Sequence, residues 1–461
     1  MSPLHVVILA AGQGKRMRSA LPKVLHRIGG RPLLEHVISA ARALGPERVH
    51  VVYGHGGDQV RDALGATEIG RDVSWIEQAE RLGTGHAVAQ AMPAVADEAM
   101  VLVLFGDVPL VRTETLAAVV ERARESGLAL LTVELEDPTG YGRILRAEDA
   151  TVRAIVEERD ADATTRAVRE INTGILAVDA TRLRGWLDRL DNRNAQGEFY
   201  LTDIIAMAVD AGVTVRTAAP TGPAEVLGVN DRSQLAELER HFQAGEARRL
   251  MAAGATLMDP ARVDVRGEVE VGQDVVIDVN VVLEGNVSIG DGVQIGPNVV
   301  VRDSRIDAGA CILANSLVEE AQVGAGCRVG PFARLRPGAV LAAEVHIGNF
   351  VEVKNSNIGV GSKANHLTYL GDSEVGAGVN VGAGTITCNY DGANKHRTVI
   401  GDGAFIGSGV ELVAPVTVGE GATIGAGSTI GRDAPAGQLT LTRAPQVTRS
   451  GWQRPVKVPK K

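Results

Sequence analysis

The sequence predicts two domains of different fold class, an α/β domain in its first half and a parallel β-helix in its second half. In the first half, short apolar runs alternate with amphipathic helical patterns, which is typical of an α/β domain built on a largely parallel sheet. In the second half an aliphatic residue recurs at every sixth position, a period that neither an α-helix nor a flat strand has. The 461 residues are also too many for one hydrophobic core.

The α/β pattern runs from residue 4 to about residue 227. The predicted strands are apolar runs at residues 5–9, 49–53 and 100–105, and the predicted helices are amphipathic stretches at residues 31–44 and 113–126. In sheets of this class, anion and metal sites lie where strands end and helices begin. The residues that follow each strand are therefore the first candidates for a functional site.

A highly charged helix is predicted next, from Gln234 to about Ala253. Asn230 and the three residues after it offer a helix cap, and the few apolar positions of the helix indicate a connector on a surface. The predicted domains are therefore residues 1–229, the connector helix 230–253, the β-helix 254–437 and a basic tail 438–461.

The sixfold repeat extends from Val265 to Ile430, with single slips of register. A hexapeptide parallel β-helix explains this period, because its aliphatic side chains stack inward while its glycines serve the turns. The repeat is broken by the insertion "CNYDGANKHRT" at residues 388–398. Loops that leave a solenoid are where ligands or neighbouring subunits usually meet it.

The composition predicts a soluble, cytoplasmic protein. A net charge of −9 argues against a dedicated nucleic-acid binder, although residues 443–461 carry six cations and no carboxylate. The three cysteines form neither a disulfide framework nor a zinc motif, which favours a reducing compartment. The first residues lack the basic region of a signal peptide, and no apolar run is long enough to span a membrane.

The stretch "LAAGQGKRMRSALPK", residues 9–23, places small residues directly before four cations. Such a turn brings bare N–H groups close to an anion while Lys and Arg side chains close around it. The alternative is an ordinary tight turn followed by an exposed basic helix face. The stretch is not a Rossmann fingerprint, because Met17 stands where the third glycine belongs, and it lacks the Ser or Thr of a Walker A motif.

The stretch resembles the nucleotide-binding signature of the sugar-nucleotide pyrophosphorylases, L-A-A-G-x-G-[ST]-R-M…P-K, with Lys15 in place of the small hydroxyl residue. In that family Arg16 and Lys23 would be catalytic, holding the leaving pyrophosphate and the developing charge. The resemblance implies that UTP is bound by Leu9, Ala10, Ala11, Gly12 and Lys23.

Further segments carry the same resemblance. In "QAERLGTGHA" it implies that Gln78, Gly83 and Thr84 contact the uracil edge. In "LFGDVPL" and "EVLGVND" it implies that Asp107 and Asn230 hold Mg²⁺, with Phe105 and Gly106 beside the nucleotide. In "PTGYGRI", "IVEERDA" and "EINTGI" it implies that Gly142, Glu157 and Asn172 contact the sugar. Taken alone, Asp107 could be a turn residue and Asn230 only a helix cap.

The β-helix carries a second group of polar residues around "SKANHLTYLGD" and "ITCNYDGANK". Taken alone, His366 would be an ordinary solvated turn residue. Stacked coils can nevertheless bring several such groups to one ligand, because equivalent positions of successive coils lie side by side. The group consists of Arg336, Lys354, His366, Tyr369, Asn380, Asn389 and Tyr390.

From end to end, through the terminal "GWQRPVK", the chain resembles the bifunctional bacterial N-acetylglucosamine-1-phosphate uridyltransferase/glucosamine-1-phosphate N-acetyltransferase family. This resemblance implies a left-handed β-helix, a homotrimer with active sites between subunits, and His366 as the general base, with Asn365 departing from the usual glycine. It implies that glucosamine 1-phosphate is bound by Arg336, Lys354, Tyr369 and Asn380, with Asn389 and Tyr390 as further substrate contacts. It implies that acetyl-CoA is bound by Ala383, Ser408, Ala426 and Arg443.

The implied function is a two-step synthesis of UDP-N-acetylglucosamine, a precursor of peptidoglycan and lipopolysaccharide. The β-helix would acetylate glucosamine 1-phosphate, and the N-terminal domain would then transfer uridylyl from UTP with Mg²⁺, with neither nucleic acid nor membrane as a partner. One alternative is a single-activity pyrophosphorylase with a structural or regulatory β-helix. A weaker alternative, an RNA-binding scaffold, fits poorly with the acidic charge and the 3% aromatic content.

Overall fold

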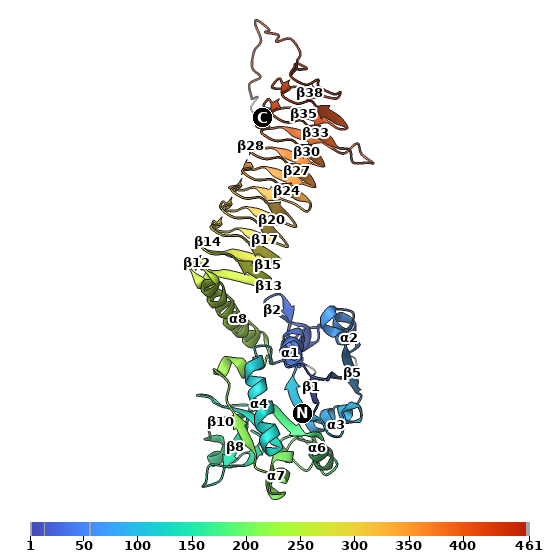
Figure 1. The fold of residues 1–461 in the computed structure, drawn as a ribbon, viewed down its shortest axis with the longest axis vertical. Coiled ribbons are helices and arrows are strands. Elements are labelled where there is room, and N and C mark those ends of the chain that lie inside the picture. The colour runs from blue at the N-terminus through green and yellow to red at the C-terminus, as the bar shows by residue number, and fades with distance from the viewer. Residues whose placement is uncertain (1, 13, 55–56, 458–461) are drawn as a thin grey trace. The chain divides into compact units, whose positions relative to one another are not determined.

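The computed structural model describes residues 2–12, 14–54 and 57–457 (Figure 1). The chain divides into two compact units, Met1–Gly245 and Glu246–Lys461, and the division falls within the long helix α8 (Arg232–Ala253). No helix among the described residues is both long and apolar enough to cross a membrane. Lys460 and Lys461 of the predicted basic tail lie outside the described residues.

The first unit is built on a twisted sheet of order β11-β7-β10-β6-β1-β4-β5. Strands β6, β1, β4 and β5 are parallel, whereas β10 runs antiparallel to both β6 and β7. A hairpin of β8 and β9 extends from β10. The strands are β1 (Leu4–Ala10), β4 (Arg48–Gly54), β5 (Val73–Gln78), β6 (Met100–Phe105), β7 (Leu128–Glu134), β8 (Gly142–Arg146), β9 (Val152–Val156), β10 (Glu170–Asp179) and β11 (Arg216–Ala218).

Helices cover both faces of this sheet because its central strands are apolar on both sides. In β1, Val6 and Ile8 join one core with α1, α2 and α4, while Val7 and Leu9 join the other with α3, α6 and α7. The helices are α1 (Leu33–Arg42), α2 (Asp58–Gly65), α3 (Thr84–Ala91), α4 (Thr113–Ser126), α5 (Ala163–Arg166), α6 (Ala180–Leu187) and α7 (Asp203–Asp210).

The predicted strands and helices of the first unit all form, with one shortened element. The helix predicted over residues 31–44 begins only at Leu33, because Arg31 and Pro32 form the short strand β3 (Arg31–Pro32) against β2 (Arg27–Ile28). Pro32 is extended, with ψ 144°, and α1 starts immediately after it.

The second unit is a parallel β-helix whose coils stack in register from β12 (Ala255–Leu257) and β13 (Val263–Val271) to β39 (Leu439–Thr440) (Figure 1). Except at the two ends and at the insertion, paired residues in adjacent coils are 17 or 18 positions apart, as for Val282 with Val300 and Val300 with Leu317. Across the insertion the interval grows to 25, between Ile386 and Glu411. The sixfold aliphatic residues form one continuous buried core, with Val271 partly buried.

The helix α8 contributes apolar residues to each unit in turn. Near its start, Leu238 packs with Met17 and Leu33, and Phe242 lies against Gly29. Gly29 has φ +54°, and a Cβ there would overlap the Phe242 ring, so this turn requires glycine. Near its end, Ala247 and Leu250 belong to the β-helix core, and Arg249 donates to the Val269 carbonyl at 3.0 Å.

A pair of stacked histidines lies inside the first unit, where His5 of β1 and His50 of β4 are 4% and 1% exposed. Their Nδ1 and Nε2 atoms are 3.0 Å apart, and the nearest carboxylate, Glu47, is 3.9 Å from His5. Burial lowers the pKa of both histidines, and the neighbouring His5 and Arg48 lower that of His50 further, to about 4. Both rings are therefore neutral in the folded protein at pH 7.

We expect this pair to make the first unit acid-sensitive. Because the folded pKa of His50 lies below its unfolded value, the unfolded chain binds more protons, so stability is full above about pH 6.5 and falls toward pH 4. The loss due to His50 should be about 3 kcal/mol. His50→Gln should reduce the dependence of the free energy of unfolding on pH. Denaturant unfolding at pH 7.5 and pH 5, followed by the fluorescence of Trp75 and Trp186, measures this dependence. An unchanged dependence in the variant would contradict this assignment.

Candidate active sites

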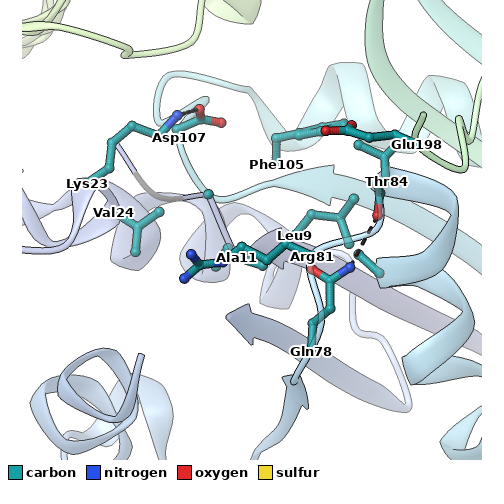
Figure 2. A pocket seen from close by; sticks show the side chains of 14 residues that line it. Leu9, Ala11, Lys23, Val24, Gln78, Arg81, Thr84, Phe105, Asp107 and Glu198 are labelled. Carbon is teal, nitrogen blue, oxygen red and sulfur yellow. Dashed lines mark hydrogen bonds and ion pairs between the residues drawn. The ribbon is translucent and has the colours of Figure 1, made fainter. Parts of the chain in front are cut away.

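A cavity of about 310 Å³ opens at the carboxyl ends of β1, β5 and β6 in the first unit. Figure 2 shows Lys23 and Asp107 together at one side of this cavity, with Gln78 and Thr84 at the other. Most of the residues predicted to bind nucleotide line it, and Val24, Arg81, Ala87 and Glu198 are additional lining residues that the sequence reasoning missed. The predicted residues in the lining are Leu9, Ala10, Ala11, Gly12, Lys23, Gln78, Gly83, Thr84, Phe105 and Asp107.

The end of the cavity predicted to hold the base is fixed by hydrogen bonds and close packing. The Gln78 side chain is 3% exposed and donates to the Gly83 carbonyl at 3.2 Å. Gly83 has φ +114°, and a Cβ there would lie 2.6 Å from the Phe199 carbonyl oxygen, so only glycine fits. The Thr84 hydroxyl accepts from the Leu201 N–H at 3.1 Å. Amide and backbone groups held in this way can read a pyrimidine edge by hydrogen bonding.

At the other end, the Lys23 ammonium lies between the two predicted metal ligands. It forms an ion pair with the Asp107 carboxylate and lies 3.4 Å from the Asn230 side-chain oxygen. The side chains of Lys23 and Asp107 are only 12% and 17% exposed. The Val229 N–H donates to the Asp107 carbonyl at 2.9 Å, which ties the segment before α8 to the end of β6.

Asn230 is not the cap of helix α8. The side chain of Asp231 caps it, because its Oδ1 accepts from the N–H groups of Ser233 and Gln234 at 2.9 Å. The Asn230 side chain is therefore available to face Lys23. A carboxylate and an amide oxygen converging on a cation are the hard oxygen donors that a magnesium ion takes. Within the described ranges, no group of three or more His, Cys, Asp or Glu side chains forms a richer metal site.

The cations of residues 14–18 are exposed and are not among the residues that line the cavity. Gly14 and Arg18 have positive φ, and a short 3₁₀ turn over Lys15–Met17 buries Met17 while Arg16 is exposed. Within the described part of the chain, Arg16 forms no ion pair with a carboxylate. The predicted role of Arg16 as a catalytic cation stays a prediction, since Arg16 is not among the residues that line the cavity. Gly106 is buried beside Leu9, whose carbonyl accepts from its N–H at 2.9 Å.

The three residues predicted to contact the sugar lie together where β10 pairs with the β8–β9 hairpin. Gly142 pairs with Asn172 across β8 and β10. A Cβ on Gly142 would lie 3.4 Å from both carboxylate oxygens of Glu157, which also accepts from the Thr202 hydroxyl at 3.0 Å. Burial raises the pKa of Glu157, and Asp203 raises it further against the effect of the Thr202 hydrogen bond. A half-buried carboxylate of this kind suits hydrogen bonds from neutral hydroxyl groups.

In the second unit, His366 ends strand β28 (Lys363–His366) and pairs with Asn349 at the end of β25 (His346–Asn349). The His366 Nδ1 lies 2.7 Å from the Asn349 side-chain oxygen. Because an amide oxygen only accepts, Nδ1 carries the proton and Nε2 keeps a free lone pair. The ring itself is exposed. Asn349 was missed by the sequence reasoning, although its position one coil before His366 was a usable signal.

His366 belongs to a column of residues at the same corner of successive coils, which we call the His366 column. The carbonyl of each member accepts a hydrogen bond from a backbone N–H group one coil further on. That N–H group belongs to the residue directly after the next member of the column. The Leu367 N–H donates to Asn349, and the Gly384 N–H to His366. Further along, the Gly409 N–H donates to Ala383 and the Gly427 N–H to Ser408. The column is therefore Asn349, His366, Ala383, Ser408 and Ala426, which places three of the four residues predicted to bind acetyl-CoA in line with the predicted base.

The fourth residue predicted to bind acetyl-CoA, Arg443, lies beside the far end of this column. Its guanidinium is 3.6 Å from the position of a Cβ on Gly425, the residue before Ala426. Asn380 begins strand β31 (Asn380–Val381), which pairs with β28. Small side chains along the column leave an open wall with a cation at its end, a surface that suits a long anionic ligand.

Three of the four residues predicted to bind the amino-sugar phosphate, Arg336, Lys354 and Tyr369, lie on or directly after strands of the other long sheet of the β-helix, whereas Asn380 lies on the sheet of β28. Arg336 forms a 2.7 Å ion pair with Glu352, which pairs in register with Tyr369. Asn389 donates to Tyr369 at 3.5 Å and also to Asp372, whereas the exposed Tyr390 donates to the Gly392 carbonyl at 2.7 Å.

A further cation, Lys395 of the insertion, lies beside Lys354 and was missed by the sequence reasoning. The proximity of Lys395 lowers the pKa of Lys354 more than the Asp372 carboxylate raises it. Two ammonium groups this close repel each other, and an anion between them would relieve that repulsion. The sequence reasoning missed Lys395 because its approach to Lys354 depends on how the insertion folds back.

Comparison with known proteins identifies the family. Residues 6–256 match the MobA-like NTP transferase domain, residues 265–366 the GMPPB C-terminal domain and residues 397–432 six repeats of the bacterial transferase hexapeptide. The bifunctional protein GlmU of Marinobacter nauticus is 59% identical over 99% of this chain and all of its own length. Those of Methylococcus capsulatus and Stutzerimonas stutzeri are 62% and 61% identical over 98% of this chain and 98% and 99% of their own. The chain belongs to the GlmU family of bifunctional proteins.

GlmU family membership confirms the predicted fold class, a nucleotidyltransferase domain followed by a hexapeptide-repeat β-helix. It also confirms the prediction of a bifunctional transferase that combines nucleotidyl and acetyl transfer. The alternative of a single-activity enzyme with a structural β-helix does not fit a bifunctional family. The roles of individual residues and the domain boundaries stay predictions.

Proposed function

We propose that the chain acetylates glucosamine 1-phosphate with acetyl-CoA at the β-helix and then transfers uridylyl from UTP to the N-acetylglucosamine 1-phosphate in the first unit. The His366 column supports this proposal, because it aligns the histidine that we assign as the base with small residues and, at its far end, Arg443. The family supports sugar phosphate and nucleotide substrates. A homotrimer formed through the β-helix, a cytoplasmic location and no nucleic-acid or membrane partner belong to the same proposal.

In acetyl transfer, the Nε2 lone pair of His366 takes a proton from the substrate amine while the nitrogen attacks the thioester carbonyl. The carbon–sulfur bond then breaks and coenzyme A leaves as the thiolate, which is protonated to the thiol. Asn349 holds the ring with Nδ1 protonated, so that Nε2 is the acceptor. Lys354, Lys395 and Arg336 supply positive charge for the phosphate of the amino sugar.

In uridylyl transfer, a phosphate oxygen of the sugar phosphate attacks the α-phosphorus of UTP, and the bond to the leaving pyrophosphate breaks. Gln78 and Gly83 orient the base, and Lys23 pairs with phosphate charge once it leaves Asp107. The nucleotidyltransferase family implies a divalent metal, and we assign Mg²⁺ to Asp107 and Asn230, whose oxygens fit it. The metal would neutralise triphosphate charge.

The test is a pair of product assays on the purified protein. With glucosamine 1-phosphate, acetyl-CoA, UTP and Mg²⁺, both coenzyme A and pyrophosphate should be released, and omission of acetyl-CoA should remove both products. N-Acetylglucosamine 1-phosphate should then restore pyrophosphate release alone. Pyrophosphate release without any acetyl transfer would leave only a single-activity nucleotidyltransferase and overturn the proposal.

A further inference from the structure

Arg143 is a fully buried cation that the proposed reactions do not use. Its side chain is 2% exposed, and its Nη2 forms a 2.8 Å ion pair with Glu158, which is 29% exposed. Arg143 also donates to the carbonyl of Tyr141, and Nη2 lies 3.4 Å from the carbonyl of Arg166. A buried charge is costly unless it is paired, and here the pairing is by the ion pair and the two carbonyls, while the Arg143 Nε and the Glu158 Oε2 have no hydrogen-bond partner among the described residues.

The ion pair joins the two segments that carry the predicted sugar contacts. Arg143 directly follows Gly142 in β8, and Glu158 directly follows Glu157 after β9. In the hairpin, Arg143 pairs with Val156, which places the two segments side by side. The Glu157 carboxylate then lies against the Cα of Gly142, in the space that a side chain at residue 142 would fill.

The arrangement on β10 completes this geometry. In the pairing of β10 with β8, Ile171 lies opposite Arg143 and Asn172 lies opposite Gly142. This pairing places Gly142 between Asn172 and the Glu157 carboxylate. Hairpin pairing fixes the main chain only as far as Val156, the last residue of β9, and the hydrogen bond from Thr202 holds the Glu157 carboxylate but not its main chain. The adjacent residue, Glu158, is anchored instead by the buried guanidinium.

We propose that Arg143 and Glu158 are positioning residues of the sugar-phosphate subsite, whose buried ion pair fixes Glu157 against Gly142 for contact with sugar hydroxyl groups. This inference rests on the proposed function of the first unit. Neither residue touches the nucleotide cavity, which is lined by other elements. The pair therefore acts on the sugar phosphate and not on UTP.

The experiment measures the KM of each substrate of uridylyl transfer separately. In Glu158→Gln the KM for N-acetylglucosamine 1-phosphate should rise about tenfold or more, because small misplacements of contact groups cost up to about 10²-fold. The KM for UTP should stay within about twofold of the parent. Arg143→Lys, which keeps the charge but not the fork of donors, should show a smaller rise. The matched control is Arg146→Gln. Arg146 lies on the same strand as Arg143, and its substitution breaks an ion pair with Glu170 of β10 but should leave both KM values unchanged.

A double variant separates positioning from stability. Arg143→Met with Glu158→Leu replaces the buried pair by apolar side chains, which often preserves stability. If the pair positions Glu157, this folded variant should keep the raised KM for the sugar phosphate. A parental KM in the double variant, or an equal rise in the KM for UTP in Glu158→Gln, would overturn the inference. Failure of the parent protein to use N-acetylglucosamine 1-phosphate would instead overturn the proposed function.

Discussion

Asp107→Ala is expected to abolish uridylyl transfer, with a loss of at least about 10³-fold, while acetyl transfer continues at the parent rate. The carboxylate is the one anionic group among the proposed metal ligands, and preorganised charge stabilisation of this kind is usually the largest contribution to catalysis. Asn230 carries no charge and cannot compensate. In the variant, the Lys23 ammonium also loses its ion-pair partner at the end of the cavity.

The controls for Asp107 follow from its surroundings. Asp107→Asn keeps the shape and one oxygen but loses the charge, so it should be nearly as inactive as Asp107→Ala. Added Mg²⁺ should restore little activity in either variant. Pyrophosphate release is measured with ready-made N-acetylglucosamine 1-phosphate, and coenzyme A release with glucosamine 1-phosphate. Uridylyl transfer at ordinary Mg²⁺ would place the metal elsewhere, and loss of both activities would indicate misfolding.

His366→Ala should separate the two activities in the opposite sense. Removal of a positioned general base costs about 10² to 10⁴-fold, and uridylyl transfer should be unaffected. The coil should still form, because the ring is exposed while the neighbouring Ala364 and Leu370 remain in the core. Residual acetyl transfer should rise between about pH 6 and pH 9, as more of the substrate amine becomes neutral.

Asn349→Ala provides the intermediate case for this base. Without the side-chain oxygen, His366 keeps its imidazole but loses the group that holds Nδ1 protonated, so we expect a smaller loss than in His366→Ala. Adding Asn349→Ala to His366→Ala should then reduce acetyl transfer little further, because Asn349 acts only through the His366 ring. A folded His366→Ala variant that acetylates at the parent rate near pH 7 would return His366 to the role of a solvated turn residue.

Local patterns were sufficient to predict most of the fold. The sixfold aliphatic spacing follows directly from coil geometry, and the strand β6 and the helix α4 have the predicted bounds. The predicted start of α1 at residue 31 was wrong, because Arg31 and Pro32 pair with β2, and helical periodicity does not report such a pairing.

The site residues that the sequence reasoning missed act through partners distant in the chain. Asn349 reaches His366 across one full coil, Lys395 reaches Lys354 only through the fold of the insertion, and Arg143 meets Glu158 across a hairpin. The resemblance named residues that would touch ligands but not the groups that hold them. Pairs such as Asn349 and His366 could be predicted from the stacking of the coils, since paired residues of most adjacent coils are 17 or 18 positions apart.

The final turns of α8 have a consequence for handling the β-helix alone. Among the described strands, β13 pairs only with β15, and β12 only with β14 (Val275–Ile277), so the first coil presents open backbone edges. Ala247 and Leu250 cover the apolar end of this coil. A β-helix fragment that begins at residue 254 would expose both the apolar end and the strand edges. Exposed strand edges promote self-association into aggregates. A soluble acetyltransferase fragment should therefore retain the helix from residue 246 or earlier.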